Sequence, residues 1–214
     1  MSACARIRRH QTPDAPGRRT RAAQSDRGAT LLDVTFALTI GATVTAISIP
    51  AVAALVDDMR AAMAARYVAA RIGALRVDAV RRSDAVALRF EPVGEDFRFA
   101  ACADGNGNGV RSTELRDGVD PVLAPFERLR DTFPGVRFGL MPGIPDADGQ
   151  SATGEDGVRV GSSRLLSMSS DGTATSGTLY IRSRRQQYAV RILGATGRTR
   201  MLQYRADTRA WLAR

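Results

Sequence analysis

The stretch RGATLLDVTFALTIGATVTAISIP, residues 27–50, opens the longest apolar segment of this 214-residue chain. Residues 29–56 contain a single charged residue, Asp33. A helix over this block would be about 42 Å long, which exceeds the roughly 30 Å of bilayer hydrocarbon. Because a carboxylate near the centre of a membrane helix costs about 2.5–3.5 kcal/mol, Asp33 is expected to have a partner or a function.

The flanks of this apolar block differ in charge. Residues 1–28 hold seven arginines against Asp14 and Asp26 and have no apolar period, which predicts an unstructured basic leader. Asp57 and Asp58 follow the block. Since basic residues favour the cytoplasmic side, the N-terminus is predicted in the cytoplasm and the chain after residue 57 outside it.

The composition disfavours several kinds of active site. The net charge is +9, and every basic side chain other than His10 is an arginine. Without residues 1–28 the chain would keep Cys102 but no histidine, so a Ser-His-Asp triad, a Cys-His pair and a histidine-rich zinc site are excluded. We therefore predict a protein that is not an enzyme. A membrane-anchored periplasmic enzyme with a carboxylate site remains an alternative, and Cys102 is expected to be a small buried hydrophobe.

Residues 57–84 continue the helical pattern beyond the apolar block. This segment is rich in Ala, Arg and Met, contains no proline, and spaces Val68, Ile72, Leu75 and Ala79 by four, three and four residues. Such a stripe indicates an amphipathic helix with one face free to pack on a sheet. We expect one helix that continues to about Arg82.

Residues 85–214 have the texture of a β-rich globular domain. Short alternating runs are joined by turn-forming clusters. The predicted strands are VALRF, DFRFAACA, VRFGL, GTLYIRS, QYAVRILG and RTRMLQY. They predict one mostly antiparallel sheet of six or seven strands, a surface loop over Pro142–Gly157, and an α+β fold class.

The junction at Gly28 resembles the class III leader of type IV prepilins and type II secretion pseudopilins. Gly28 precedes the small residue Ala29, Asp33 follows five positions after Gly28, and Pro50 lies within the apolar helix. The resemblance implies that a prepilin peptidase cuts between Gly28 and Ala29 and that the new N-terminus is methylated. It also implies that Asp33 and Pro50 serve subunit assembly.

Two other interpretations of the apolar block stay open. It could be an uncleaved single-pass anchor, or a secretory signal cut after the sequence Ala51-Val52-Ala53. Asp33 departs from the prepilin pattern, which has Glu at this place. Its charge nevertheless has a physical use, because cleavage creates an α-ammonium at Ala29 that a carboxylate of a neighbouring subunit could neutralise.

The segment SMSSDGTATSGTLYIRSRRQQYAVRILGATGRTRM, Ser167–Met201, resembles the closing region of the GspH/FimT family of minor pseudopilins and minor pilins. The resemblance implies a type IV pilin-like fold, with the long helix packed on a β-sandwich-like domain. It further implies a subunit of a type II secretion pseudopilus or a type IV pilus in a Gram-negative bacterium. The chain would cross the inner membrane once, keep its C-terminal domain in the periplasm, and contact other pilins and secreted cargo.

The sequence Gly197-Arg198-Thr199-Arg200 matches the G-R-x-R element that DNA-binding members of this family use. Further arginines lie nearby in the sequence: Arg182, Arg184, Arg185, Arg191 and Arg205. Clustered guanidinium groups bind phosphates without sequence preference, so double-stranded DNA is a candidate partner. Alternatively, these arginines only make the sheet surface soluble.

The segment Asp104–Gly109 has oxygen ligands at alternate positions, in Asp104, Asn106 and Asn108, like the first half of a calcium loop. The bidentate carboxylate expected at position twelve is replaced by Leu115, with Glu114 one residue early. Asn-Gly steps also form tight turns by themselves. We favour a turn without a cofactor, with Ca²⁺ as the alternative.

Overall fold

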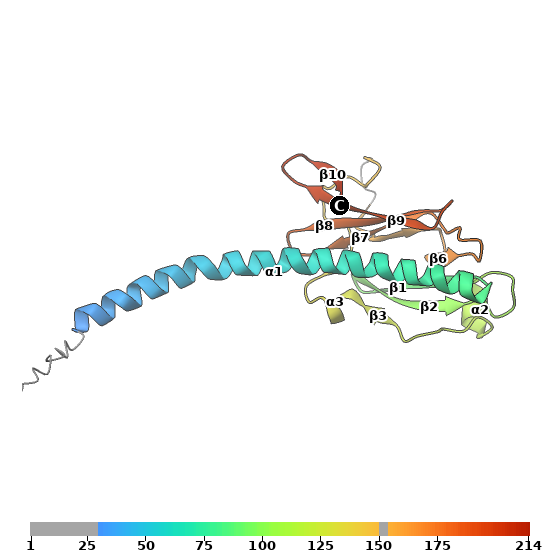
Figure 1. Cartoon of the computed structure of the whole chain (residues 1–214), viewed down its shortest axis with the longest axis horizontal. Helices are drawn as coiled ribbons and strands as arrows, with labels where there is room; N and C mark the ends of the chain where they lie inside the picture. Colours follow the sequence, from blue (N-terminus) through green and yellow to red (C-terminus); the bar gives the residue numbers. More distant parts are fainter. Residues whose placement is uncertain (1–29, 150–153) are drawn as a thin grey trace, which may run out of the picture. The chain divides into compact units, whose positions relative to one another are not determined.

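The computed structural model of the chain describes residues 30–149 and 154–214 (Figure 1). Gly28, Ala29 and the leader lie outside the described residues. The chain forms two compact units, one that ends at Thr45 and one that comprises Ala46–Arg214. The second unit contains all strands of the described chain.

One continuous helix, α1 (Leu31–Arg82), passes from the first unit into the second. It is long and apolar enough to cross a membrane, and its most apolar stretch is exposed. The predicted end at about Arg82 is confirmed. Within the second unit, one face is buried and consists of Ala61, Ala64, Ala65, Val68, Ile72, Leu75 and Ala79, so the predicted stripe is also confirmed.

The strands form two antiparallel sheets. The first has the order β3-β2-β1-β6, with β1 Val86–Val93, β2 Asp96–Ala103, β3 Glu127–Arg128 and β6 Leu165–Met168. The second has the order β10-β9-β8-β7-β4, with β5 also paired to β7. Its strands are β4 Arg137–Phe138, β5 Val158–Val160, β7 Gly177–Arg182, β8 Gln187–Leu193, β9 Arg198–Arg205 and β10 Ala210–Ala213. Two short helices, α2 (Ser112–Asp117) and α3 (Leu129–Thr132), flank β3 in the sequence.

A single core joins the buried face of α1 to both sheets. Phe138 from β4 lies at its centre and meets the rings of Phe90, Phe97 and Phe99 edge-on, with centroids 5.7–6.5 Å apart. The alternation of strand residues explains which side chains enter this core. In β7, Leu179 and Ile181 point inward, whereas Tyr180 belongs to a second cluster on the outer face with Trp211.

The α+β class predicted from the sequence agrees with this architecture, but the prediction of one sheet with six or seven strands is wrong. The described chain has ten strands in two sheets. β3, β5, β6 and β10 were not expected, because they are two to four residues long and carry too little alternation to be recognised. The predicted strand VRFGL contributes only Arg137 and Phe138.

Candidate functional site

The first turn of α1 is closed by Thr30 and Asp33. Thr30 donates from its backbone N–H and from Oγ1 to Asp33 Oδ2, at 3.1 and 2.8 Å, and Asp33 donates its N–H to Thr30 Oγ1 at 3.2 Å. This is a capping box, in which two otherwise unpaired N–H groups of a helix start are satisfied reciprocally. The sequence Thr-x-x-Asp before an apolar run is the signal for this cap. The prepilin resemblance instead predicted a role for Asp33 in subunit assembly.

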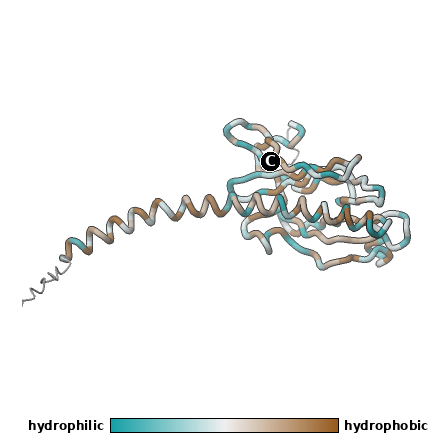
Figure 2. The backbone as a smooth tube through the Cα atoms, in the orientation of Figure 1, coloured by the Kyte–Doolittle hydropathy of each residue, from teal (hydrophilic) through white to brown (hydrophobic). Residues whose placement is uncertain are grey.

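The first part of α1 exposes large apolar side chains, among them Leu31, Leu38 and Ile47, each at least 68% exposed. Figure 2 shows that apolar residues predominate along this part of the helix. Hydroxyl groups of threonines in this part donate to carbonyls three or four residues earlier, which hides their polarity within the helix. Pro50 lies inside α1, and the helix continues through it. This surface is therefore suited to lipid or to other apolar helices.

The acidic pair that follows the apolar block attaches α1 to the second sheet. Asp57 Oδ2 accepts a hydrogen bond from Ser183 Oγ at 2.6 Å and one from the Arg185 N–H at 3.3 Å. Asp58 Oδ1 accepts one from Gln186 Nε2 at 2.9 Å. The connection between β7 and β8 is therefore fixed beside residues 57 and 58 of α1.

Farther along α1, Glu127 of β3 holds the other side of the helix. Tyr67 Oη donates to Glu127 Oε2 at 2.5 Å, and Arg71 Nε donates to Oε1 at 3.1 Å. Burial and the adjacent Glu127 carboxylate raise the pKa of Tyr67, so the phenol stays protonated and remains a donor at neutral pH. α1 is thus joined to both sheets by polar contacts in addition to the apolar core.

The arginines that the sequence suggested for DNA binding lie at two opposite ends of the second sheet. Arg184 and Arg185 are exposed in the connection beside Asp57, separated from Arg182 by Ser183. Arg198 and Arg200 lie at the start of β9, where a Cβ at Gly197 would be 3.2 Å from Arg76 Cδ. Residues 57 and 76 of α1 are about 28 Å apart along the helix. These arginines therefore do not form one continuous basic patch.

Several of these arginines already have partners. Arg182 donates to the Leu140 carbonyl and forms an ion pair with Glu155, while Arg191 pairs with Asp148. Arg205 pairs with Asp207 at 3.0 Å. These pairs favour a structural or solubility role for Arg182, Arg191 and Arg205.

A cavity of about 460 Å³ lies between α1 and the start of β9, lined by Gly73, Arg76, Val77, Val80, Gly197, Arg198 and Thr199. Arg76 Nε is buried and has no hydrogen-bond partner among the described residues. The exposed Arg198 lies on the same cavity, and Arg200 follows on the same face of β9. This end of the sheet therefore offers two exposed guanidinium groups beside a third that is partly buried.

The Asp104 loop is organised by carboxylates that accept backbone N–H groups. Asp104 accepts from Asn106, Gly107 and Gly109, and Asp120 accepts from Gly105 and Arg111. Burial by itself raises the pKa of Asp104, but the backbone donors more than offset this and hold the pKa below its usual value. The loop thus has its own hydrogen-bonded framework.

Two side chains complete this loop. Asn108 Nδ2 donates to Glu114 Oε1 at 2.8 Å, whereas Glu114 Oε2 is buried and has no hydrogen-bond partner in the described part of the chain. Residues 30–149 and 154–214 hold no group of three or more His, Cys, Asp or Glu side chains arranged to bind a metal. The assignment of Asp104, Asn106 and Asn108 as metal ligands stays a prediction.

Cys102 is fully buried in a small cluster with Ala87, Val110, Leu115 and Leu165, as expected for a hydrophobe. Burial raises the pKa of its thiol to about 11. The thiol is therefore protonated and unreactive at neutral pH.

Comparison with known proteins gives no match to a family model, a curated protein or a solved structure.

Proposed function

We propose that this chain is a minor pseudopilin or minor pilin, processed after Gly28 by a prepilin peptidase and assembled through α1 into a periplasmic filament. The observation that carries the proposal is the construction of α1. It is one 52-residue helix whose first part is apolar and exposed and whose second part packs one face into the core of a two-sheet unit. With the sequence Gly28-Ala29-Thr30 directly before it, this arrangement is what the type IV pilin resemblance leads one to expect.

The exposed part of α1 needs an apolar environment before and after assembly. In the inner membrane that environment is lipid, and an uninterrupted helix satisfies its own backbone there. In a filament it would be the equivalent helices of neighbouring subunits, which could replace lipid at the same surface. α1 would therefore serve first as a single-pass anchor and then as the contact of the filament core.

Asp33 would then have two successive functions. In the single chain its carboxylate caps α1 through Thr30. A carboxylate has two oxygens, and only Oδ2 accepts from Thr30. Oδ1 would remain to meet the methylated amine of a neighbour's Ala29 in the filament.

Assembly can be tested by comparing the wild type with Gly28→Leu in cells that contain a prepilin peptidase and the partner subunits. The wild type should lose its leader and appear in sheared filaments. Gly28→Leu should stay in the membrane fraction at full length. Equal incorporation of both proteins would contradict the proposal, and a Gly17→Leu variant controls for glycine loss elsewhere in the leader.

A second candidate function, DNA binding for uptake, is supported by Arg198 and Arg200. Both are exposed at the start of β9, and neither forms an ion pair with another described residue. Duplex DNA would meet their guanidinium groups through its phosphates, so binding would be independent of sequence and weakened by salt. This function would be an addition to the filament role.

A further inference from the structure

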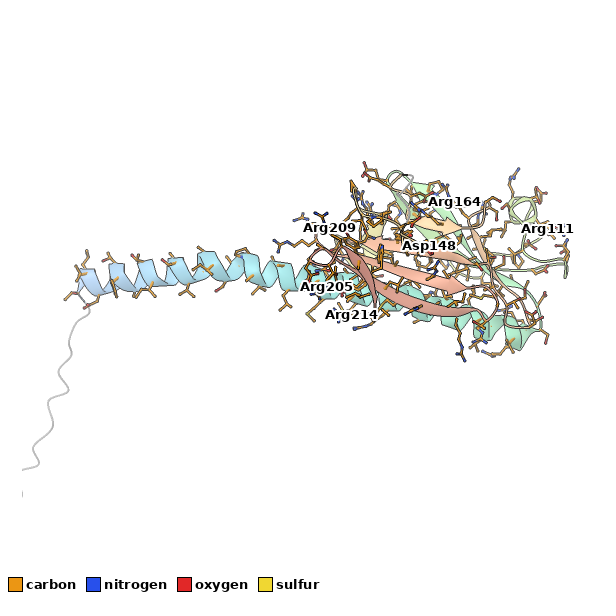
Figure 3. The ribbon with its side chains drawn as sticks, turned by 90° about the horizontal axis from the view of Figure 1, so that it is seen from above. Arg111, Asp148, Arg164, Arg205, Arg209 and Arg214 are labelled. Carbon is orange, nitrogen blue, oxygen red and sulfur yellow. The ribbon has the colours of Figure 1, made fainter. Side chains whose placement is uncertain are left out.

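Five exposed arginines gather at the end of the Ala46–Arg214 unit that lies beside residues 57 and 58 of α1. We call them the proximal arginines: Arg184, Arg185, Arg205, Arg209 and Arg214. Three of them, Arg205, Arg209 and Arg214, are seen in Figure 3 near the point where α1 leaves the sheets. They come from the β7–β8 connection, the end of β9, the β9–β10 connection and the residue after β10.

Hydrogen bonds fix the level of this cluster relative to α1. Asp58 accepts from Gln186, Gln186 Oε1 accepts from Gln203 at 2.9 Å, and Gln203 Oε1 accepts from Arg214 Nε at 2.7 Å. These hydrogen bonds link α1 to Arg214 through the β7–β8 connection and β9. Asp58, Arg185, Arg205 and Arg214 also line one common cavity of about 460 Å³.

The same level corresponds to a membrane surface if α1 spans a bilayer, and here the inference rests on the proposed function. The uncharged residues 34–56 form a helix about 34 Å long, close to the roughly 30 Å of hydrocarbon. Asp57, the first charge after them, would therefore lie among the lipid head groups. The β7–β8 connection is hydrogen-bonded to Asp57, so Arg184 and Arg185 would lie there too.

The charges of the cluster are only partly compensated. The guanidinium groups of Arg184, Arg185 and Arg209 have no hydrogen bond or ion pair with any described residue, whereas Arg205 is paired with Asp207. The carboxylates of Asp57 and Asp58 are engaged by Ser183, the Arg185 N–H and Gln186. Three exposed guanidinium groups at this end of the unit are therefore free to bind an anionic partner.

We propose that the proximal arginines bind the phosphates of anionic phospholipids in the leaflet where α1 emerges into the periplasm. Guanidinium groups bind phosphate through two parallel hydrogen bonds, and an anionic surface attracts such groups within a Debye length of about 10 Å. The proximal arginines lie far from the apolar block in the sequence, and only the fold brings them to the membrane surface. They therefore do not oppose the orientation set by the leader, which depends on charges near the ends of the spanning segment.

This contact holds the folded unit against the membrane while α1 is embedded, and it is released when the subunit enters a filament. Because α1 already tethers the unit, the arginines meet the head groups at high effective concentration, and weak individual contacts suffice.

The test uses the full-length chain in nanodiscs of phosphatidylcholine, with or without a third of phosphatidylglycerol, and follows amide hydrogen exchange. Exchange in residues 183–186 and 206–209 should slow about threefold or more with the anionic lipid, and high salt should remove the effect. Arg184→Gln with Arg185→Gln and Arg209→Gln should abolish it. The control Arg82→Gln with Arg111→Gln and Arg116→Gln removes the same charge at the other end and should preserve it.

Equal exchange in both kinds of nanodisc, or equal loss in both triple variants, would overturn the lipid contact. Carbonate extraction of native membranes distinguishes failure of the lipid contact from failure of the proposed function. A chain that resists extraction but shows no lipid dependence refutes only the contact, whereas a chain released by carbonate refutes the membrane anchor as well.

Discussion

Asp33 Oδ2 lies 2.8 Å from Thr30 Oγ1, and the two residues cap the first turn of α1 reciprocally. This contact gives the one charge of the apolar block a partner within its own chain. The question of why a carboxylate occurs there then has two answers, the cap and the neutralisation of a neighbour's amine, and suitable substitutions separate them.

Asp33→Asn should keep the cap, since an amide oxygen also accepts from Thr30, but it removes the charge. If charge neutralisation drives assembly, filaments should contain little Asp33→Asn and little Asp33→Ala, while Asp33→Glu should assemble at least as well as the wild type. The measurement is the fraction of processed protein in sheared filaments. Full assembly of Asp33→Asn would show that the cap alone accounts for this residue.

DNA binding should depend on one end of the second sheet. Arg198→Gln with Arg200→Gln should abolish retardation of duplex DNA by the full chain in neutral nanodiscs at low salt. Arg184→Gln with Arg185→Gln removes equal charge at the opposite end and should retain most of the retardation. Equal losses in both pairs would indicate a diffuse charge effect and would contradict a site at β9.

The packing of α1 on the sheets should depend on its buried stripe. Ile72 is fully buried, so Ile72→Ala should lower the free energy of unfolding by about 2–5 kcal/mol. Val77 lies on the same helix but is 56% exposed. Val77→Ala should therefore change the free energy of unfolding by less than about 0.5 kcal/mol. Denaturant unfolding of the detergent-solubilised chain measures both. Similar losses would show that this stripe does not form the core.

The Asp104 loop should lose its stability in acid. The folded-state pKa of Asp104 is below the unfolded value near 3.8, so its contribution is complete above that pH and is lost as the pH falls through the folded pKa. Asp104→Asn should be less stable than the wild type at pH 7, and this difference should shrink below about pH 4. Thermal unfolding between pH 7 and pH 2 tests this, with Asp117→Asn as a control that follows the wild type.

Calcium should leave the melting temperature of the wild type unchanged at about 1 mM, within the affinity range of extracellular calcium modules. If calcium raised the melting temperature of the wild type but not that of Asp104→Asn, the loop would be a metal site that includes Glu114.

The sequence was informative where one period persists over many residues. The stripe from Val68 to Ala79 predicted both the helix and its buried face, because each turn repeats the same signal. β5 and β6 could not be predicted in this way, since three or four residues hold hardly two alternations and their place depends on pairing with β7 and β1.

The candidate sites show the same limit. Arg184 and Arg198 are close in sequence but lie at opposite ends of β8, because one strand carries the chain from one end of the sheet to the other. Conversely, Arg185 and Arg214 come together only through the order of β7, β8, β9 and β10. The capping role of Asp33 was readable locally, since it needs only the spacing to Thr30.

The most direct test of the filament-subunit proposal is the N-terminus of the protein isolated from membranes of a host that contains a prepilin peptidase. Mass spectrometry and N-terminal sequencing should find a chain that begins at Ala29 and carries one methyl group on its amine. A chain that begins at Met1 would indicate an uncleaved anchor, and one that begins at Ala54 would indicate a secretory signal; either result would contradict the proposal.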